Sequence, residues 1–235
     1  MKKLAGLLLG IILGSSLGFG QRPMSAGGNL DADSLWIYMQ RSLEEVIKKQ
    51  EDILGIKHSG KPEIKFISFP IRGILARYDS KKDIIEINPS FFFARSRLLS
   101  HELGHRYPNQ LIKNLMGVDW PDYKKYPFNF EENDSGDKGK KMIYEGMAEY
   151  FELRTFADTV AMELKHKDFD DYFKEEGFMP FYDVGYAIVK PILDKNIDLG
   201  IKYLTKNPPT NEELKDILAY RQRILREFEE FTEEK

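Results

Sequence analysis

The sequence predicts an α+β domain, in which a small mixed sheet accompanies a mostly helical body. Three short runs rich in Ile and Phe, at 63–69, 71–78 and 84–88, alternate apolar and polar residues as strands do. Longer stretches on both sides of these runs repeat apolar residues at helical spacing instead. With 235 residues, of which 42% are hydrophobic and 13% aromatic, the chain can bury one sizeable core. We therefore expect a single domain over residues 31–235.

Residues 1–20 are expected to be an export signal that stands apart from the fold. Two lysines give a basic start, residues 4–19 form an uncharged apolar run, and small residues precede a cleavage point after Gly20. The run is glycine-rich and short for a membrane span, which favours cleavage and a periplasmic or extracellular protein; an uncleaved inner-membrane anchor is the alternative. Residues 21–30 then form a spacer. The chain has no cysteine, so neither a lipoprotein nor a disulfide is expected.

The domain is predicted to begin with a helix over residues 35–54. Asp31 or Ser34 can serve as its N-cap, and Gly55 is expected to end it. Its apolar residues recur at helical spacing and are expected to face the core. The three predicted strands follow, the last two joined by a turn at 79–83.

The segment after the strands holds the strongest chemical signal, the pentapeptide His-Glu-Leu-Gly-His at 101–105. It lies in a stretch with no helix breaker before Pro108, which we expect to end the helix. Two imidazoles four residues apart, His101 and His105, stand on one helix face and can hold a single zinc ion. Glu102 between them is placed to take a proton from a water molecule. The alternative is a chance pattern, with both histidines as polar points on an amphipathic helix.

A zinc site of the catalytic type needs a third ligand from elsewhere in the chain. A metzincin would supply it as a histidine at position 111, but the chain has Leu111 there. A second helical segment instead carries Glu145 and Glu149, four residues apart and therefore on one face. A carboxylate oxygen beside two imidazoles would complete a His2Glu site and leave the fourth position for water.

With these two segments the chain resembles the gluzincin zinc metallopeptidases, and most of all the catalytic core of the aminopeptidase N type enzymes. In the latter, the HExxH helix is followed by a Glu-Gly-x-Ala-Glu-Tyr motif, which residues 145–150 match. The resemblance implies a gluzincin-like core with the sheet over the cleft. It also implies that Glu145 is the third zinc ligand and that Glu149 orients a ligand histidine by accepting its imidazole N–H. The alternative for Glu149 is a solvated helix carboxylate paired with a nearby Lys or Arg.

A third segment, Tyr-x-x-Gly at 182–185, resembles the element that follows the zinc helices in the same enzymes. The resemblance implies that the Tyr182 hydroxyl donates to the oxyanion of the tetrahedral intermediate, work that a neutral phenol can do. Tyr186, one helical turn on, and His166 are the alternative donors, and either tyrosine could simply pack against the core. Apart from that role, His166 and also His58 are expected to be ordinary surface histidines.

The chain also departs from this family. Thirty-nine residues lie between His105 and Glu145, so an insertion at 117–140 is expected to loop out and form a rim or lid over the cleft. No Gly-Ala-Met-Glu-Asn element precedes the pentapeptide, so the resemblance does not extend to exopeptidase specificity. In gluzincins a sheet edge pairs with the extended substrate. The alternative is an edge that is merely protected by charged residues such as Lys65 or Arg77.

The end of the chain is predicted to be helical. Pro208 and Pro209 interrupt the preceding segment, and Thr210 with Glu213 makes a capping box. We expect this last helix to run to a charged, frayed end.

Composition and motifs together indicate a class of function. A formal net charge of -3 gives no electrostatic reason to expect a nucleic acid or an anionic membrane surface as a partner. We expect an exported zinc-dependent peptidase with one zinc ion per chain and a peptide or protein as substrate. The alternative is a catalytically silent gluzincin-fold protein that binds or scaffolds in the cell envelope. The presence of Glu102, which metal binding does not need, favours the enzyme.

Overall fold

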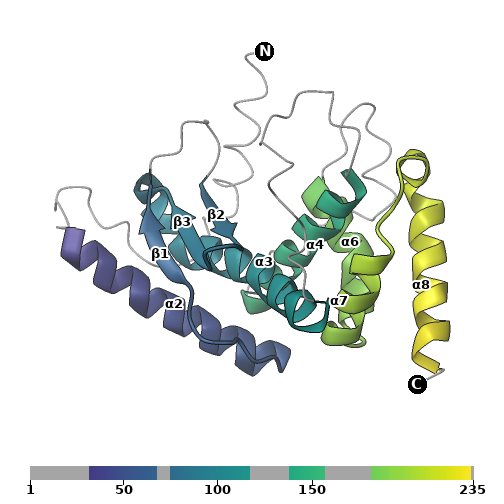
Figure 1. Cartoon of the computed structure of the whole chain (residues 1–235). Coiled ribbons are helices and arrows are strands. Elements are labelled where there is room, and N and C mark those ends of the chain that lie inside the picture. Colours follow the sequence, from purple (N-terminus) through teal and green to yellow (C-terminus); the bar gives the residue numbers. More distant parts are fainter. Residues whose placement is uncertain (1–31, 68–74, 117–137, 157–180, 234–235) are drawn as a thin grey trace, which may run out of the picture.

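The computed structural model describes residues 32–67, 75–116, 138–156 and 181–233. These residues form an α+β fold that is mostly helical and contains one three-stranded mixed sheet, which confirms the predicted fold class (Figure 1). None of the described helices combines the length and the apolar character needed to cross a membrane. The expected signal and spacer, residues 1–30, lie outside the described residues.

The helices and strands follow one another along the chain in a simple order. They are α2 (Ala32–Leu54), β1 (Glu63–Phe66), β2 (Ala76–Asp79), β3 (Ile84–Ile87), the 3₁₀ helix η2 (Pro89–Ala94), α3 (Arg95–Met116), α4 (Lys138–Thr155), α6 (Phe181–Leu193), α7 (Ile197–Lys206), the 3₁₀ turn η5 (Glu213–Lys215) and α8 (Ile217–Glu233).

The sheet has β3 at its centre, with β1 parallel and β2 antiparallel to it. A tight turn joins β2 to β3: the Asp79 carboxylate accepts from the backbone N–H of Lys81 at 3.1 Å, and Asp83 adopts a φ of 54°. The strands are shorter than predicted, because β1 ends at Phe66 and β2 begins only at Ala76. The parts of the two predictions that fall on 68–74 lie outside the described residues.

One apolar core lies between α2, the sheet and α3. Met39 and Leu43 of α2 pack here with Ile85 of β3 and Leu103 of α3, all of them fully buried. Gly55, with a φ of 66° and its N–H bonded to the Glu51 carbonyl, ends α2 as predicted.

The predicted start of α2 was wrong. The helix already begins at Ala32, so Ser34 lies inside it and is not its N-cap. The acidic Asp33 lies in the first turn, where a negative charge interacts favourably with the helix dipole. This interaction stabilises a helix that begins before Ser34. The other expected cap, Asp31, lies outside the described residues.

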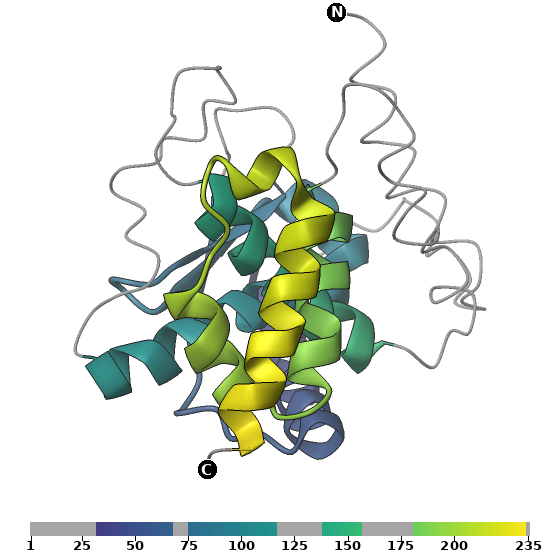
Figure 2. The same ribbon diagram turned by 90° about the vertical axis from the view of Figure 1, so that its right-hand side faces the viewer.

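A second core joins α3 to the C-terminal helices. Ile112 of α3, Met147 and Phe151 of α4, Val189 of α6 and Phe228 of α8 belong to it. In the view of Figure 2, α8 runs along the outside of this helical body. Helix α3 therefore lies between the sheet-side core and the helical core, and its two faces are buried by different parts of the chain.

The prediction that Pro108 ends the helix of His101 and His105 was wrong, because α3 continues to Met116. A proline inside a helix removes one backbone hydrogen bond and crowds the preceding turn, which costs roughly 3 kcal/mol. Here the residues around it, Tyr107, Asn109 and Ile112, are buried. Tertiary packing on this face outweighs the local cost and keeps the helix intact.

The capping box at the end of the chain forms, but it begins a different element from the one expected. The Thr210 N–H donates to Glu213 at 2.9 Å, and the Glu213 N–H donates back to the Thr210 hydroxyl at 3.3 Å. These bonds precede the short turn η5, whereas α8 starts at Ile217. Asp216 stands just before α8 and accepts from the backbone N–H of Ala219 at 3.1 Å.

Candidate metal centre

Three glycines allow α3, α4 and α6 to approach one another at backbone contact. A methyl group on Gly104 of α3 would lie 2.8 Å from the Ala148 Cα atom of α4. A methyl group on Gly146 of α4 would lie 2.3 Å from the carbonyl carbon of Gly185 of α6. Both separations are shorter than a carbon contact allows, so only glycine fits. These glycines belong to the three sequence motifs, and their contacts bring the motif side chains together.

His101, His105 and Glu145 converge on one point between α3 and α4. The Nε2 atom of His101 lies 3.5 Å from Oε2 of Glu145, and the Nε2 atom of His105 lies 3.4 Å from the same oxygen. The candidate ligand atoms of all three residues lie within 4.8 Å of one another. Two imidazole nitrogens and a carboxylate oxygen at this spacing could hold a metal ion.

The pKa values of these three side chains are shifted by burial and by one another. Burial by itself raises the pKa of Glu145, but the adjacent His105 and His101 outweigh it and hold the pKa well below its usual range. Burial lowers the pKa of His105. For His101, hydrogen bonds to two carboxylates overcome the effect of burial and raise the pKa well above its usual value. The cluster therefore keeps an ionised carboxylate in a buried place, where it needs positive charge nearby.

Glu102 is buried beside the cluster, with 5% of its surface exposed. A backbone hydrogen bond from Tyr78 of β2 reaches its carboxylate, while Oε2 has no hydrogen-bond partner among the described residues. Burial, together with the charge of Glu145 and against the effect of His101, raises the pKa of Glu102 to about 7. A carboxyl group with such a pKa can both take up and release a proton near neutral pH.

The second nitrogen of His101 faces two carboxylates of α4. Its Nδ1 atom lies 3.2 Å from Oε2 of Glu152 and 3.8 Å from Oε2 of Glu149. Only the first separation is a hydrogen bond. Glu149, expected to orient a ligand histidine, thus lies near His101 but beyond hydrogen-bonding distance. It is also mostly buried, and burial together with the charge of Glu152 raises its pKa to about 8, so it is not a solvated surface carboxylate.

Sequence reasoning missed Glu152 and its partner Arg97. The Nε atom of Arg97 donates to Oε1 of Glu152 at 2.6 Å. The signal was present in the spacing, because Glu152 follows Glu149 by three residues and so continues the same helix face, and Arg97 precedes His101 by four. Nothing in either segment alone indicated that the two faces meet.

Tyr182, but not Tyr186, lies beside the histidines. The Tyr182 ring centroid is 5.9 Å from that of His101, and its hydroxyl hydrogen-bonds to Glu145. The negative charge of Glu145 is the main reason why the pKa of Tyr182 lies well above its usual value, so the phenol stays neutral. Tyr186 is buried and its ring packs 6.5 Å from that of Tyr150. The third candidate donor, His166, lies outside the described residues.

Tyr144 is a further neighbour that the sequence did not reveal. It is fully buried, and its ring stacks on the His105 imidazole with centroids 4.0 Å apart. The Nδ1 atom of His105 has no hydrogen-bond partner among the described residues. Stacking on Tyr144 therefore limits the ring orientation of His105, whereas a hydrogen bond to Glu152 limits that of His101.

The expectation that His58 is an ordinary surface histidine was wrong. Its Nε2 atom lies 2.9 Å from Oε1 of the Gln50 side chain, and its ring packs edge-on against Tyr107. Burial is the main reason why the pKa of His58 falls to about 4, and the positive charge of Arg106 adds to it. The sequence could not predict this packing, because a position beside a turn does not indicate which residues cover the His58 side chain.

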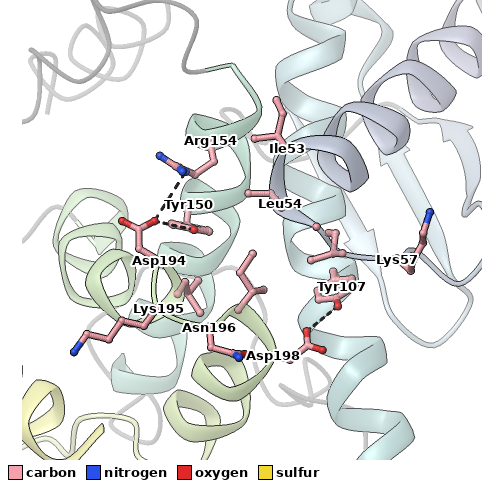
Figure 3. Close-up of a pocket in the computed structure, with 14 residues that line it drawn as sticks. Ile53, Leu54, Lys57, Tyr107, Tyr150, Arg154, Asp194, Lys195, Asn196 and Asp198 are labelled. Atoms are coloured by element: carbon pink, nitrogen blue, oxygen red, sulfur yellow. Dashed lines mark hydrogen bonds and ion pairs between the residues drawn. The ribbon is translucent and has the colours of Figure 1, made fainter. Parts of the chain in front are cut away.

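A separate pocket of about 560 Å³ lies between the end of α2, α4 and the segment that joins α6 to α7 (Figure 3). None of the candidate metal ligands lines it. Its two aspartates accept tyrosine hydroxyls, Asp198 from Tyr107 at 2.8 Å and Asp194 from Tyr150 at 2.9 Å. The two aspartates that line the pocket therefore serve the packing between helices, because each accepts a hydrogen bond from a tyrosine of a neighbouring helix.

The expected insertion at 117–140 is only partly visible. Residues 138–140 already form the first turn of α4, and residues 117–137 lie outside the described residues.

Comparisons of the chain with protein-family models, with curated proteins and with solved structures found no match. The resemblance to gluzincins therefore rests on the motif residues of the sequence alone.

Proposed function

We propose that the protein is an exported zinc-dependent peptidase that hydrolyses peptide bonds at the site of His101, His105 and Glu145. The observation that carries the proposal is the approach of both Nε2 atoms to one Glu145 oxygen, with the buried Glu102 beside them. The export part of the proposal rests on the sequence of residues 1–20.

The donor set favours zinc over other common metal ions. His101, His105 and Glu145 would hold the ion through two nitrogens and one oxygen, which is the ligand set of catalytic zinc sites. Calcium and magnesium prefer sites made of oxygen ligands alone. When bound, zinc supplies a Lewis acid that polarises a carbonyl group and lowers the pKa of water.

Glu102 would act as the general base and then as the general acid. It would accept a proton from the attacking water and return it to the leaving amine, and a pKa near 7 suits both transfers. The hydrogen bond from the Tyr78 backbone occupies part of the carboxylate, and the unpartnered Oε2 is the oxygen available for proton transfer.

Tyr182 would stabilise the negative charge that develops on the carbonyl oxygen. Its hydroxyl is a neutral donor next to Glu145, and the residue is 48% exposed, so a substrate can reach it. A donor aimed at an oxyanion acts on the transition state more than on the substrate, which is how such a residue raises turnover.

The substrate is expected to lie along β2. Among the described residues this strand is an edge of the sheet, and its Tyr78 backbone hydrogen-bonds to Glu102. An extended peptide that lies along β2 beside Glu102 would bring its backbone next to the general base. Arg77, the charged residue that could instead protect this edge, pairs with Glu86 of the neighbouring strand β3.

A peptidase assay with a chelator control tests the proposal. Purified protein is incubated with a mixture of internally quenched peptides, before and after removal of metal and after addition of stoichiometric zinc. We expect hydrolysis that is lost on chelation and restored by zinc. A protein that binds zinc but cleaves no peptide or protein would instead support the silent binding or scaffold function.

A further inference from the structure

We propose that Glu152, held by Arg97, is the positioning residue that fixes the orientation of His101 for metal binding. The family resemblance gives this role to Glu149, three residues earlier on the same helix. The inference rests on the proposed metal centre and deepens it, because it names the pair that prepares one of the ligands.

The two nitrogens of His101 have different tasks in this arrangement. Nε2 lies 3.5 Å from Glu145 and faces the other candidate ligands, whereas Nδ1 lies 3.2 Å from Glu152. A proton held on Nδ1 by a carboxylate leaves the Nε2 lone pair for a metal ion and limits rotation of the ring. Glu149, at 3.8 Å, does not make this hydrogen bond.

Glu152 is suited to the task because its two oxygens are divided between two partners. Oε1 accepts from Nε of Arg97 at 2.6 Å and also lies against its Nη2 atom, while Oε2 faces His101. Glu152 as a residue is 7% exposed, and an arginine partner keeps a buried carboxylate ionised and fixed in direction. Arg97 and His101 are four residues apart on α3, so one helix face carries both contacts.

The same carboxylates raise a competing possibility. His101, Glu149 and Glu152 lie close enough to hold a metal ion of their own. However, Nδ1 cannot donate a proton to Glu152 and also give its lone pair to a second ion. The Arg97 guanidinium at Glu152 would also repel another cation. The geometry therefore favours an orienting hydrogen bond and one metal ion per chain.

The test compares zinc affinity among matched variants of the full chain. Glu152→Gln is expected to weaken zinc binding by about 10- to 100-fold, the usual cost of losing a partner of a ligand histidine. Glu149→Gln is expected to cost clearly less. Glu213→Gln, which breaks another Arg–carboxylate pair on η5, serves as the control and should leave the affinity unchanged. Affinity is measured by competition with a chelating indicator, on variants whose folding is checked by circular dichroism.

Arg97→Gln provides a second variant in case Glu152→Gln does not fold. It leaves Glu152 in place but removes its support, so zinc affinity should fall by less than in Glu152→Gln. In the double variant the Arg97 change should add little, because the arginine acts through Glu152. A Glu149→Gln loss equal to or larger than that of Glu152→Gln would overturn the proposal. Two zinc ions per wild-type chain would overturn it as well.

A readout in the metal-free protein separates this inference from the proposed function. The His101 Nδ1–H proton, hydrogen-bonded to a carboxylate, should give a downfield proton resonance that Glu152→Gln shifts more than Glu149→Gln. If that pattern appears but the wild-type protein cleaves no peptide, the peptidase proposal fails and the positioning role stands. If peptides are cleaved but the resonance responds only to Glu149→Gln, the positioning role of Glu152 fails alone.

Discussion

Gly146 of α4 and Gly185 of α6 are in direct backbone contact, so that a methyl group on Gly146 would lie 2.3 Å from the Gly185 carbonyl carbon. The residue before Gly146 is the candidate ligand Glu145, and Tyr182 lies three residues before Gly185. The contact between the two glycines thus sets the separation between the candidate metal centre and the candidate oxyanion donor.

This contact predicts that Gly146→Ala and Gly185→Ala destabilise the protein. The added methyl group meets backbone atoms, which cannot move aside as side chains can, so we expect each change to cost about 1–3 kcal/mol or more. Urea denaturation measures the effect. Gly200→Ala is the matched control, because its methyl group would meet mainly side chains: Leu193 at 2.8 Å and Ile192 at 3.0 Å, with one backbone oxygen, that of Ile192, at 3.3 Å. Equal stability of all three variants would mean that the helices are not held this closely.

The ligand set predicts about one zinc ion per chain in purified protein. Chelation should remove the ion, and His101→Ala or His105→Ala should weaken its binding severely, since each removes one of three protein ligands. Elemental analysis after gel filtration measures the content. Protein that holds no stoichiometric metal after incubation with zinc would reject the metal centre.

The candidate site was predictable from the sequence where helix periodicity alone places side chains. The spacing of four between His101 and His105 is enough to align two imidazoles, whatever the rest of the fold does. The pairing of Arg97 with Glu152 was not predictable, because it depends on which faces of α3 and α4 meet. The choice between Tyr182 and Tyr186 was not predictable either. The two residues lie one turn apart on α6, and only the packing of α6 against α4 decides which of them faces the histidines.

The fold was predictable at the level of its class and of most of its elements. The errors arose where a local rule met a tertiary contact that outweighs it. Pro108 is a strong helix breaker by itself, yet α3 continues because the residues around it are buried. The box of Thr210 and Glu213 forms as expected, but Asp216 rather than Thr210 stands at the start of α8.

A third prediction concerns the proposed general base. Glu102→Gln keeps the shape of the side chain but cannot accept a proton, so zinc content should stay near that of the wild type while turnover falls by about 10² to 10⁴. Steady-state kinetics with a quenched peptide, alongside metal analysis, measure both quantities. Unchanged turnover in a zinc-loaded variant would reject the role of Glu102.

A fourth prediction follows from the partly buried His58 and concerns stability at acidic pH. The side-chain nitrogen of Gln50 donates to Ser100, so its oxygen faces His58 and Nε2 of His58 carries the proton. A second proton would have to enter at Nδ1, which is buried without a hydrogen-bond partner among the described residues. This agrees with the pKa of about 4, lowered mainly by burial from 6.5.

Because the pKa of His58 is lower in the folded protein than in the unfolded chain, the unfolded chain binds more protons between those two values. The contribution of His58 to stability is therefore fully present above pH 6.5 and is lost as the pH falls from 6.5 towards 4. His58→Gln, which can still donate to Gln50, should lose less stability across this window than the wild type does. Thermal unfolding at a series of pH values measures the difference, and parallel curves for the two proteins would contradict the prediction.

The last prediction separates the two tyrosines of α6. Tyr182→Phe removes one hydroxyl and almost no volume, so an oxyanion donor at this position should lose roughly 10² to 10³ in kcat with little change in KM. Zinc content and thermal stability should stay close to those of the wild type, because Tyr182 is 48% exposed and contributes little to the core. Tyr186→Phe is the matched control, since that ring packs against Tyr150 in the interior. It should affect stability more than turnover. If Tyr186→Phe lowers kcat and Tyr182→Phe does not, the ring beside His101 is a lining residue only, and the Tyr-x-x-Gly resemblance does not extend to its function.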